Sequence, residues 1–418
     1  MSEILFLAHR VPFPPDRGDK IRSNHLLRRI AEIGPVHVGA LADDAADMAQ
    51  EGELAAIAAS HCLVRRCAPL PLAALAALGQ GKPVSLAAFA SAKLQRYVRH
   101  VLQTRPIAAI FVFSGQMAQY VPAAFRGRVV MDFVDVDSAK FEAYAQTGAL
   151  ARRLLYAREA RLMRRFEEST ARRATTSLFI SREERALFES RLEEGAAPDV
   201  RALGNGIDTV FFDPAQAVPI ADLQGGGPNI VFTGQMDYPP NIAAVELFVH
   251  AVMPQVLQVH SEARFAIVGR APTAAVRALA GLNNTIVTGP VPDVRPWLAG
   301  ADIVTAPLVI ARGVQNKVLE AMAMARPVLL TPAAATGIAA TDGQHFALAS
   351  TPDVLAARAL GLLADKPAAQ AMGAAARCFV IAECGWDRVL APLRALLEVL
   401  PESLGPENLG PEGLDDAA

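Results

Sequence analysis

The sequence has little cysteine and few aromatic residues. Of its 418 residues only 4 are cysteine and 2 are tryptophan, and 6% are aromatic in total. The cysteines have neither the C-x-x-C spacing nor the neighbouring histidines of a zinc site. We interpret them as buried or free thiols of a cytosolic protein rather than as a disulfide framework: Cys62, Cys67, Cys378 and Cys384.

The chain also lacks a large net charge and long apolar runs. The net charge of −2 argues against a general nucleic-acid-binding protein, whose domains are strongly basic. No apolar run reaches the ~18 residues of a membrane span, and the most apolar stretch, residues 69–78, contains two prolines. The first nine residues lack the basic region of a signal peptide, so we expect none. With 52% hydrophobic residues, this length predicts a soluble protein of two domains.

What the chain does contain is an alternation of short apolar runs and longer helical segments. This pattern is typical of parallel α/β sheets. Helices are expected at residues 22–33 and 151–174. Strands are expected at residues 4–8, 36–41, 108–113, 129–133 and 177–180, and again at 229–233, 264–268, 285–288, 302–306 and 328–331.

A segment rich in proline and glycine divides the two series of strands. Residues 214–228 contain three consecutive glycines, which predicts a linker near residue 220. We therefore expect a first domain at 1–215 and a second at 216–384, facing each other across a cleft, because parallel sheets bind ligands beyond the carboxyl ends of their strands. A helix at about 385–400 is expected to pack back on the first domain. The acidic residues 401–418 predict a disordered tail.

The loop after the first strand contains no G-x-G-x-x-G, which disfavours a dinucleotide-dependent dehydrogenase. It is proline-rich and leads into a helix at Gly18 and Asp19. Gly18 would let the backbone approach a ligand, and Lys20 and Arg22 are expected to face the cleft. The alternative is an ordinary helix start, with Asp19 as the N-cap and both cations in solvent.

Two charged segments in the first half each allow two interpretations. The acids of residues 132–138 would bind Mg²⁺ through Asp135 and Asp137, or they end a strand and cap the next helix. The helix at 151–174 carries eight arginines and three glutamates around Leu155, Leu162 and Phe166. It would contact anionic lipid headgroups, or it is a solvated helix whose apolar stripe packs on the sheet.

Strands of the second half end in glycine, and a charged helix follows them. Gly234, Gly269 and Gly289 would bring bare backbone close to a phosphate, with Gln235, Asn241 or Arg270 beside it. The helix entered near Gly313 offers unpaired N–H groups to an anion. Its side chains add positive charge and, at Glu320, a carboxylate within reach of a ribose. The residues expected to act there are Arg312, Asn316, Lys317 and Glu320.

Together these segments resemble glycosyltransferase family 4, whose members are retaining enzymes of GT-B fold. The matching segments are residues 232–241, 266–269, 289–293 and 319–323. More narrowly, residues 14–22 and 312–320 resemble the exosortase-associated sugar transferases of bacterial exopolysaccharide clusters.

The resemblance implies two Rossmann-like domains and transfer of a sugar from a nucleotide diphosphate, with retention and without a cofactor or an obligatory metal. It implies that Glu320 binds the donor ribose. The chain departs from the family at three positions: Arg312 stands where the family has its first glutamate, Gln235 stands near its arginine, and Ser114 near its histidine. Lys317, with Arg312 or Arg270, would supply the missing charge.

The sequence thus predicts a cytoplasmic glycosyltransferase, peripheral at the inner face of the plasma membrane through the helix at 152–173. Its acceptor would be a glycan or a polyprenyl-linked molecule. The expected catalytic residues are Arg312 and Lys317. Two alternatives remain: a nucleotide-sugar epimerase of the same fold, and a non-catalytic scaffold of a polysaccharide assembly complex.

Overall fold

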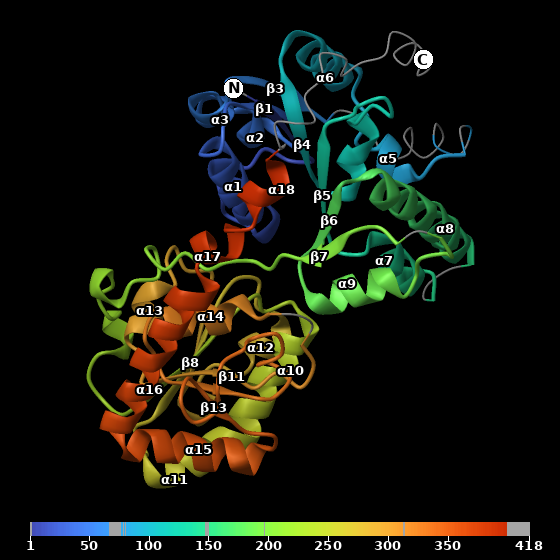
Figure 1. The fold of residues 1–418 in the computed structure, drawn as a ribbon. Helices are drawn as coiled ribbons and strands as arrows, with labels where there is room; N and C mark the ends of the chain where they lie inside the picture. The colour runs from blue at the N-terminus through green and yellow to red at the C-terminus, as the bar shows by residue number, and fades with distance from the viewer. Residues whose placement is uncertain are drawn as a thin grey trace. The chain divides into compact units, whose positions relative to one another are not determined.

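The protein folds into two compact units, each built on a parallel sheet (Figure 1). The structure, a computed structural model, describes residues 2–66, 77, 79, 81–146, 150–195, 197–311 and 314–398. The first unit contains the chain up to Asn205 and the segment from Leu390, and the second runs from Gly206 to Val389. The boundary therefore lies at residue 205 instead of 215.

The first unit contains a sheet of seven described strands in the order β3-β2-β1-β4-β5-β6-β7, paired in parallel throughout. The central strands are buried along their whole length, as expected for a parallel sheet covered on both faces. The strand order reverses between β1 and β4, where Leu7 pairs with Val112. The strands are β1 Glu3–Ala8, β2 Val36–Ala42, β3 Ser60–Arg65, β4 Ile107–Phe113, β5 Arg128–Val134, β6 Thr176–Phe179 and β7 Val200–Ala202.

The second unit repeats this plan with six described strands in the order β10-β9-β8-β11-β12-β13. All its pairings are parallel. Val231, Phe232 and Ile267 are completely buried at its centre. The strands are β8 Asn229–Thr233, β9 Arg264–Val268, β10 Thr285–Gly289, β11 Ile303–Ala306, β12 Val328–Leu330 and β13 Ala347–Leu348.

Helices connect the strands in both units. In the first unit they are α1 Gly18–Ala31, α2 Ala45–Met48, α3 Glu51–Ile57, α5 Val84–Ala87, α6 Ala92–Thr104, η1 Gly115–Tyr120, α7 Asp137–Tyr144, α8 Leu150–Arg173, α9 Arg182–Glu189 and α18 Leu393–Leu397. In the second they are η2 Pro214–Gln216, η3 Ala221–Leu223, α10 Pro239–Leu247, η4 Phe248–Val252, α11 Met253–Val259, α12 Ala274–Arg277, η5 Leu282–Asn284, α13 Arg295–Ala299, α14 Asn316–Ala323, α15 Pro352–Ala364, α16 Lys366–Phe379 and η6 Val380–Cys384. Helix α17, Trp386–Leu390, reaches the boundary.

The last helix, α18, belongs to the first unit. Its residues Leu393, Leu396 and Leu397 are buried, and Nη1 of Arg128 on β5 donates to the Leu396 carbonyl oxygen at 3.3 Å. Residues 401–418, expected as a disordered tail, lie outside the described part of the chain.

The prediction of a linker near residue 220 was wrong. Leu223 is buried in the core of the second unit, and its carbonyl oxygen accepts a hydrogen bond from Asn229 Nδ2 at 2.9 Å. Arg264 on β9 donates to the carbonyl oxygens of Asp222 and Gly225. The glycine-rich segment is therefore fastened to the second sheet, because the bare backbone that suggested flexibility also lets it lie close to β9.

One continuous helix in the second unit, Pro239–Val259, is long and apolar enough to cross a membrane by length and composition. It combines α10, a π-helical turn at Phe248–Val252 and α11. Val245, Val249 and Val256 are completely buried against the second core. Packing within the unit therefore accounts for part of its apolar character, since 39% of its most apolar window is buried.

Candidate functional site

Three neighbouring strands of the second sheet end in glycine turns. The backbone N–H of Gly234 donates to Val268 at 3.0 Å, and that of Gly269 donates to Gly289 at 3.3 Å, so the turns of β8, β9 and β10 are fixed side by side. A Cβ atom on Gly269 would lie 1.7 Å from the Gly234 carbonyl oxygen. Only glycine fits there. The edge consequently presents bare backbone to an approaching ligand.

Helix α14 directs Lys317 toward the same turns. Lys317 is the second residue of this helix, and its Nζ donates to Asn241 Oδ1 at 2.6 Å. The ammonium group also lies 4.4 Å from the centre of the Phe232 ring, a cation–π distance. A Cβ atom on Gly234 would come within 3.0 Å of Nζ. The lysine therefore points at the Gly234 turn.

Lys317 and Glu320 both titrate near neutral pH. Burial lowers the pKa of Lys317 to about 8, and the charge of Glu320 offsets only part of that effect. Burial likewise raises the pKa of Glu320 to about 7, opposed by Lys317. Such shifts are common where a site awaits a charged ligand. A bound anion would favour the protonated form of Lys317.

The remaining residues predicted for this edge are solvent-exposed or lie beyond the described chain. Nη2 of Arg270 donates to Gln235 Oε1 at 3.1 Å, so an exposed guanidinium lies beside the Gly234 turn. Asn316 is exposed as the first residue of α14. Arg312 and Gly313 lie outside the described residues, and their predicted roles stay predictions.

In the first unit, the expectation that Lys20 and Arg22 face a ligand was wrong. Lys20 is buried, and its Nζ donates to Asp47 Oδ1 at 2.6 Å and to the Phe13 carbonyl oxygen at 3.0 Å. Arg22 is 1% exposed, and its Nε donates to the completely buried Asp132 at 2.9 Å. Both cations are paired with buried carboxylates that lie far from them in the sequence.

The two other residues of that group lie at the surface of helix α1. Gly18 is exposed, and a Cβ atom there would meet nothing within 4 Å. Asp19 lies in the first turn, and the N-cap position belongs to Arg17, whose side chain makes no capping bond. Asp19 instead accepts a hydrogen bond from Arg10 at 2.6 Å.

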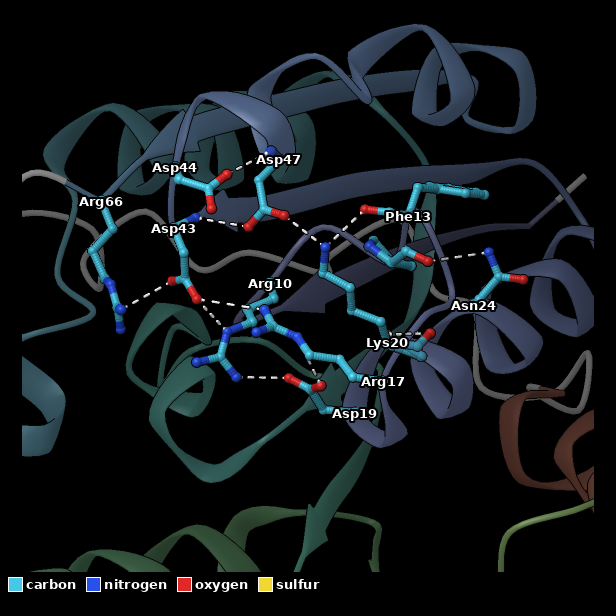
Figure 2. A network of polar contacts seen from close by, with 12 residues as sticks. Arg10, Phe13, Arg17, Asp19, Lys20, Asn24, Asp43, Asp44, Asp47 and Arg66 are labelled. Carbon is cyan, nitrogen blue, oxygen red and sulfur yellow. Dashed lines mark hydrogen bonds and ion pairs between the residues drawn. The ribbon is translucent and has the colours of Figure 1, made fainter. Parts of the chain in front are cut away.

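A network of charges that no sequence motif indicated lies beside Asp19 (Figure 2). Asp43, which follows β2, accepts from Arg10 Nε at 2.5 Å and pairs with Arg66 at 2.9 Å. Burial would raise the pKa of Asp43, but Arg10, Arg66 and Arg17 together hold it below its usual value. The sequence does offer one indication of this network, because Arg10, Asp43 and Arg66 each follow closely on a strand of the same sheet.

The acids expected as a possible Mg²⁺ site already have cationic partners. Lys140 Nζ donates to Asp135 at 2.9 Å and to Asp137 at 3.2 Å. The start of helix α7 is instead fixed by Glu167, which accepts from both the backbone N–H and the hydroxyl of Ser138. Throughout the described residues, no group of three or more His, Cys, Asp or Glu side chains is arranged to hold a metal.

Comparison with protein families assigns a class to the second unit. Residues 227–365 match the family model described as glycosyl transferases group 1. They contain β8 to β13, the three glycine turns and helix α14. This part of the chain is thus similar to the group 1 glycosyltransferases. A search of curated protein sequences gave no significant match.

Solved structures share the fold of the whole chain at low sequence identity. HepE from Anabaena in complex with UDP and glucose is 15% identical, with a TM-score of 0.62 over 96% of this chain and 100% of that one. Sucrose-phosphate synthase from Thermosynechococcus elongatus is also 15% identical, with a TM-score of 0.61 over 95% and 98%. WaaG, a glycosyltransferase involved in lipopolysaccharide biosynthesis, is 17% identical, with a TM-score of 0.57 over 94% and 98%.

The fold is that of the GT-B glycosyltransferases, with two Rossmann-like parallel-sheet domains. The family-model match at residues 227–365 supports a glycosyltransferase, and the structural relatives support the fold.

Proposed function

We propose that the protein transfers a sugar from a nucleotide diphosphate to a glycan or lipid-linked acceptor, with retention of anomeric configuration, in bacterial exopolysaccharide synthesis. The observation that carries the proposal is Lys317, held against Phe232 and Asn241 and aimed at the Gly234 turn. Structures of Anabaena HepE with UDP or UDP-glucose have the same fold, which supports a nucleotide-sugar as the donor.

The chemistry of such a transfer suits the groups at this edge. Negative charge develops on the leaving diphosphate, so fixed positive groups around it stabilise the transition state. Lys317 provides one cation, Arg270 a second, and the N-terminal amides of α14 add the positive end of a helix dipole. Glu320 would accept hydrogen bonds from the ribose, and Arg312 would add charge at the entrance to α14. Since side chains supply the positive charge, the proposal requires no resident metal or cofactor.

We further propose a cytoplasmic protein that touches the inner face of the plasma membrane through α8. Leu150 and Leu154 on this helix are 68% and 63% exposed, and Arg152 and Arg153 between them are exposed too. Apolar side chains among arginines suit an interface of acyl chains and anionic headgroups. The buried face of α8, which includes Ala171, packs on the first sheet. Membrane contact and packing therefore use different parts of one helix.

Nucleotide binding tests the proposal directly. We expect UDP, GDP or ADP, or one of their sugar derivatives, to raise the melting temperature, since saturation at 100 times Kd stabilises a protein by about 2.7 kcal/mol. Lys317→Ala should weaken that ligand at least about tenfold, because a charge-assisted hydrogen bond contributes about 1.5–3 kcal/mol. Lys366→Ala, which removes an exposed lysine elsewhere in the second unit, is the matched control.

Two results would overturn this proposal. One is a folded wild-type protein that binds none of these nucleotides or nucleotide-sugars. The other is a Lys317→Ala variant that binds as tightly as the Lys366→Ala control. NMR of the products separates transfer from epimerisation, because an epimerase would change the donor sugar without any acceptor present.

A further inference from the structure

Three arginines lie close to strand ends in the first sheet. Arg10 follows β1, Arg66 follows β3, and Arg17 immediately precedes α1 (Figure 2). Arg10 has the shortest pairings of the three, because its Nη1 donates to Asp19 at 2.6 Å and its Nε to Asp43 at 2.5 Å. These two bonds hold the loop after β1 against Asp43, which follows β2.

Arg17 and Arg66 are engaged far less. Arg17 approaches Asp19 at 3.3 Å and Asp43 at 3.5 Å, and Arg66 pairs with Asp43 at 2.9 Å. Their side chains are 40% and 30% exposed. A guanidinium group has five N–H donors, so most donors of both residues lack a close acceptor within the described chain. Among the described residues, three guanidinium groups thus share two carboxylates, which leaves donors of Arg17 and Arg66 for an anion.

An apolar pocket adjoins this cluster. The guanidinium carbon of Arg66 lies 4.6 Å from the centre of the Phe89 ring, and Phe89 is also part of the wall of a pocket of about 260 Å³. The wall draws on α5, α7 and α8, which are separate in sequence. Its apolar members are Val84, Ala88, Phe89, Phe141, Leu155 and Tyr156.

The polar side chains Glu159, Ser85 and Gln116 of the pocket wall already have hydrogen-bond partners. Glu159 accepts hydrogen bonds from the backbone N–H groups of Val84 and Ser85 and from the Ser85 hydroxyl. Gln116 Nε2 donates to Asp137 at 2.9 Å. A bound polyol would therefore find few free partners in this wall, whereas an apolar chain would find ring and methyl surface.

Apolar side chains continue past the pocket. The Tyr144 ring lies 5.6 Å from that of Tyr156 and is 53% exposed, and Leu154 lies one residue before Leu155 of the wall. A chain longer than the pocket would therefore meet further apolar surface on α7 and α8.

We propose that this edge binds an apolar chain bearing a phosphate or diphosphate, and that such a lipid phosphate is the acceptor substrate. The head group would bind Arg17 and Arg66, and the chain would pass Phe89 into the pocket. The arginine pair alone or the apolar pocket alone would suit many ligands. Because the two adjoin at the Phe89 ring, together they select a molecule with a charged head and an apolar tail. The choice of acceptor rests on the proposed function; the binding site itself does not.

Calorimetry with farnesyl diphosphate and the full-length protein tests this inference. We expect farnesyl diphosphate to bind at least about tenfold more tightly than farnesol or inorganic pyrophosphate, since each of these offers only one half of the recognition. The double variant Arg17→Gln, Arg66→Gln should lose at least about tenfold in affinity, and so should Leu155→Asp, which places a carboxylate in the apolar wall.

Matched controls lie on helix α9 of the same unit. Arg185→Gln removes an exposed arginine paired with Glu189, and Leu187→Asp changes a leucine that is 37% exposed, against 38% for Leu155. Both should bind farnesyl diphosphate like the wild type. Circular dichroism of each variant verifies that its fold is intact.

Several outcomes would overturn the inference. Equal affinity of wild type and both site variants would do so, as would pyrophosphate or farnesol binding as tightly as farnesyl diphosphate. The proposed function can fail separately. A protein that binds UDP-sugars but not farnesyl diphosphate loses only the lipid phosphate site, and the reverse result removes the glycosyltransferase and leaves that site standing.

Discussion

The carboxyl edges of the two sheets share one architecture and differ in chemistry. In the first unit the edge is filled with charged side chains that mostly hold one another, such as Arg10 with Asp19 and Asp43. In the second, three glycine turns leave the backbone bare, and Lys317 makes its hydrogen bond to a neutral amide, that of Asn241.

This difference shows how one fold is adapted to two tasks. A network of compensated charges stabilises the first edge before any ligand arrives, and Arg10 in particular serves the fold through its bonds to Asp19 and Asp43. A lysine in a partly apolar setting costs stability, because burial disfavours its charged form. An anion that restores the charge recovers that cost. Lys317 of the second edge would therefore be stabilised by a bound anion, whereas Arg10 of the first edge is already compensated by Asp19 and Asp43.

The strongest test of the comparison removes a compensated charge from the first unit. We expect Arg22→Met to destabilise the protein by about 3–5 kcal/mol, because it leaves the completely buried Asp132 without its cation. Urea unfolding followed by circular dichroism measures the loss. Arg185→Met, which breaks the exposed pair with Glu189, should cost less than about 1 kcal/mol. A loss of similar size in both variants would show that the buried pair has no special role.

A smaller effect is expected from filling the bare backbone of the second unit. Gly269→Ala should cost about 2–4 kcal/mol, because its Cβ atom would overlap the Gly234 carbonyl oxygen and the residue has a φ of +151°. Gly18→Ala at the first-unit edge should change stability by less than about 1 kcal/mol, since its Cβ atom meets nothing. Thermal unfolding compares the two. The comparison fails if Gly269→Ala is as stable as Gly18→Ala.

The smallest expected effect is a pH dependence of donor binding. The pKa of Lys317 is lowered to about 8, so the lysine loses its proton as the pH rises through that value, and a diphosphate prefers the protonated form. UDP affinity should therefore fall between about pH 8 and 9.5, by up to tenfold per unit, or about 1.4 kcal/mol. Calorimetry measures the slope. Lys317→Arg should flatten it, since arginine stays charged; an equal slope in that variant would assign the proton to another group.

Much of the fold could be predicted from the sequence. Buried strands such as β1, β4 and β8 are continuous apolar runs, which is what a parallel sheet covered on both faces requires. Strands β3, β7 and β13 were missed. β7 and β13 are only three and two residues long, and β3 is half-exposed, so none of them gives a continuous apolar signal.

Part of the candidate site could likewise be predicted from the sequence, and part of it could not. The glycine turns and Lys317 could be predicted because glycine after a strand is a local signal, and helix α14 begins near its expected start. The fate of Lys20 and Arg22 could not, because their partners Asp47 and Asp132 lie 27 and 110 residues away. The sequence shows where a charged residue stands, but it does not indicate which distant residue neutralises that charge in the fold.

The segment by which the chain enters the second unit contacts the segment by which it leaves. Ile207 donates its backbone N–H to Cys384 at 2.8 Å, and a Cβ atom on Gly206 would collide with Trp386. In topological terms the second unit is an insertion whose two ends are already joined by hydrogen bonding. Such a segment, residues 206–389, is a natural candidate for excision or circular permutation, because closing its ends would require only a short peptide.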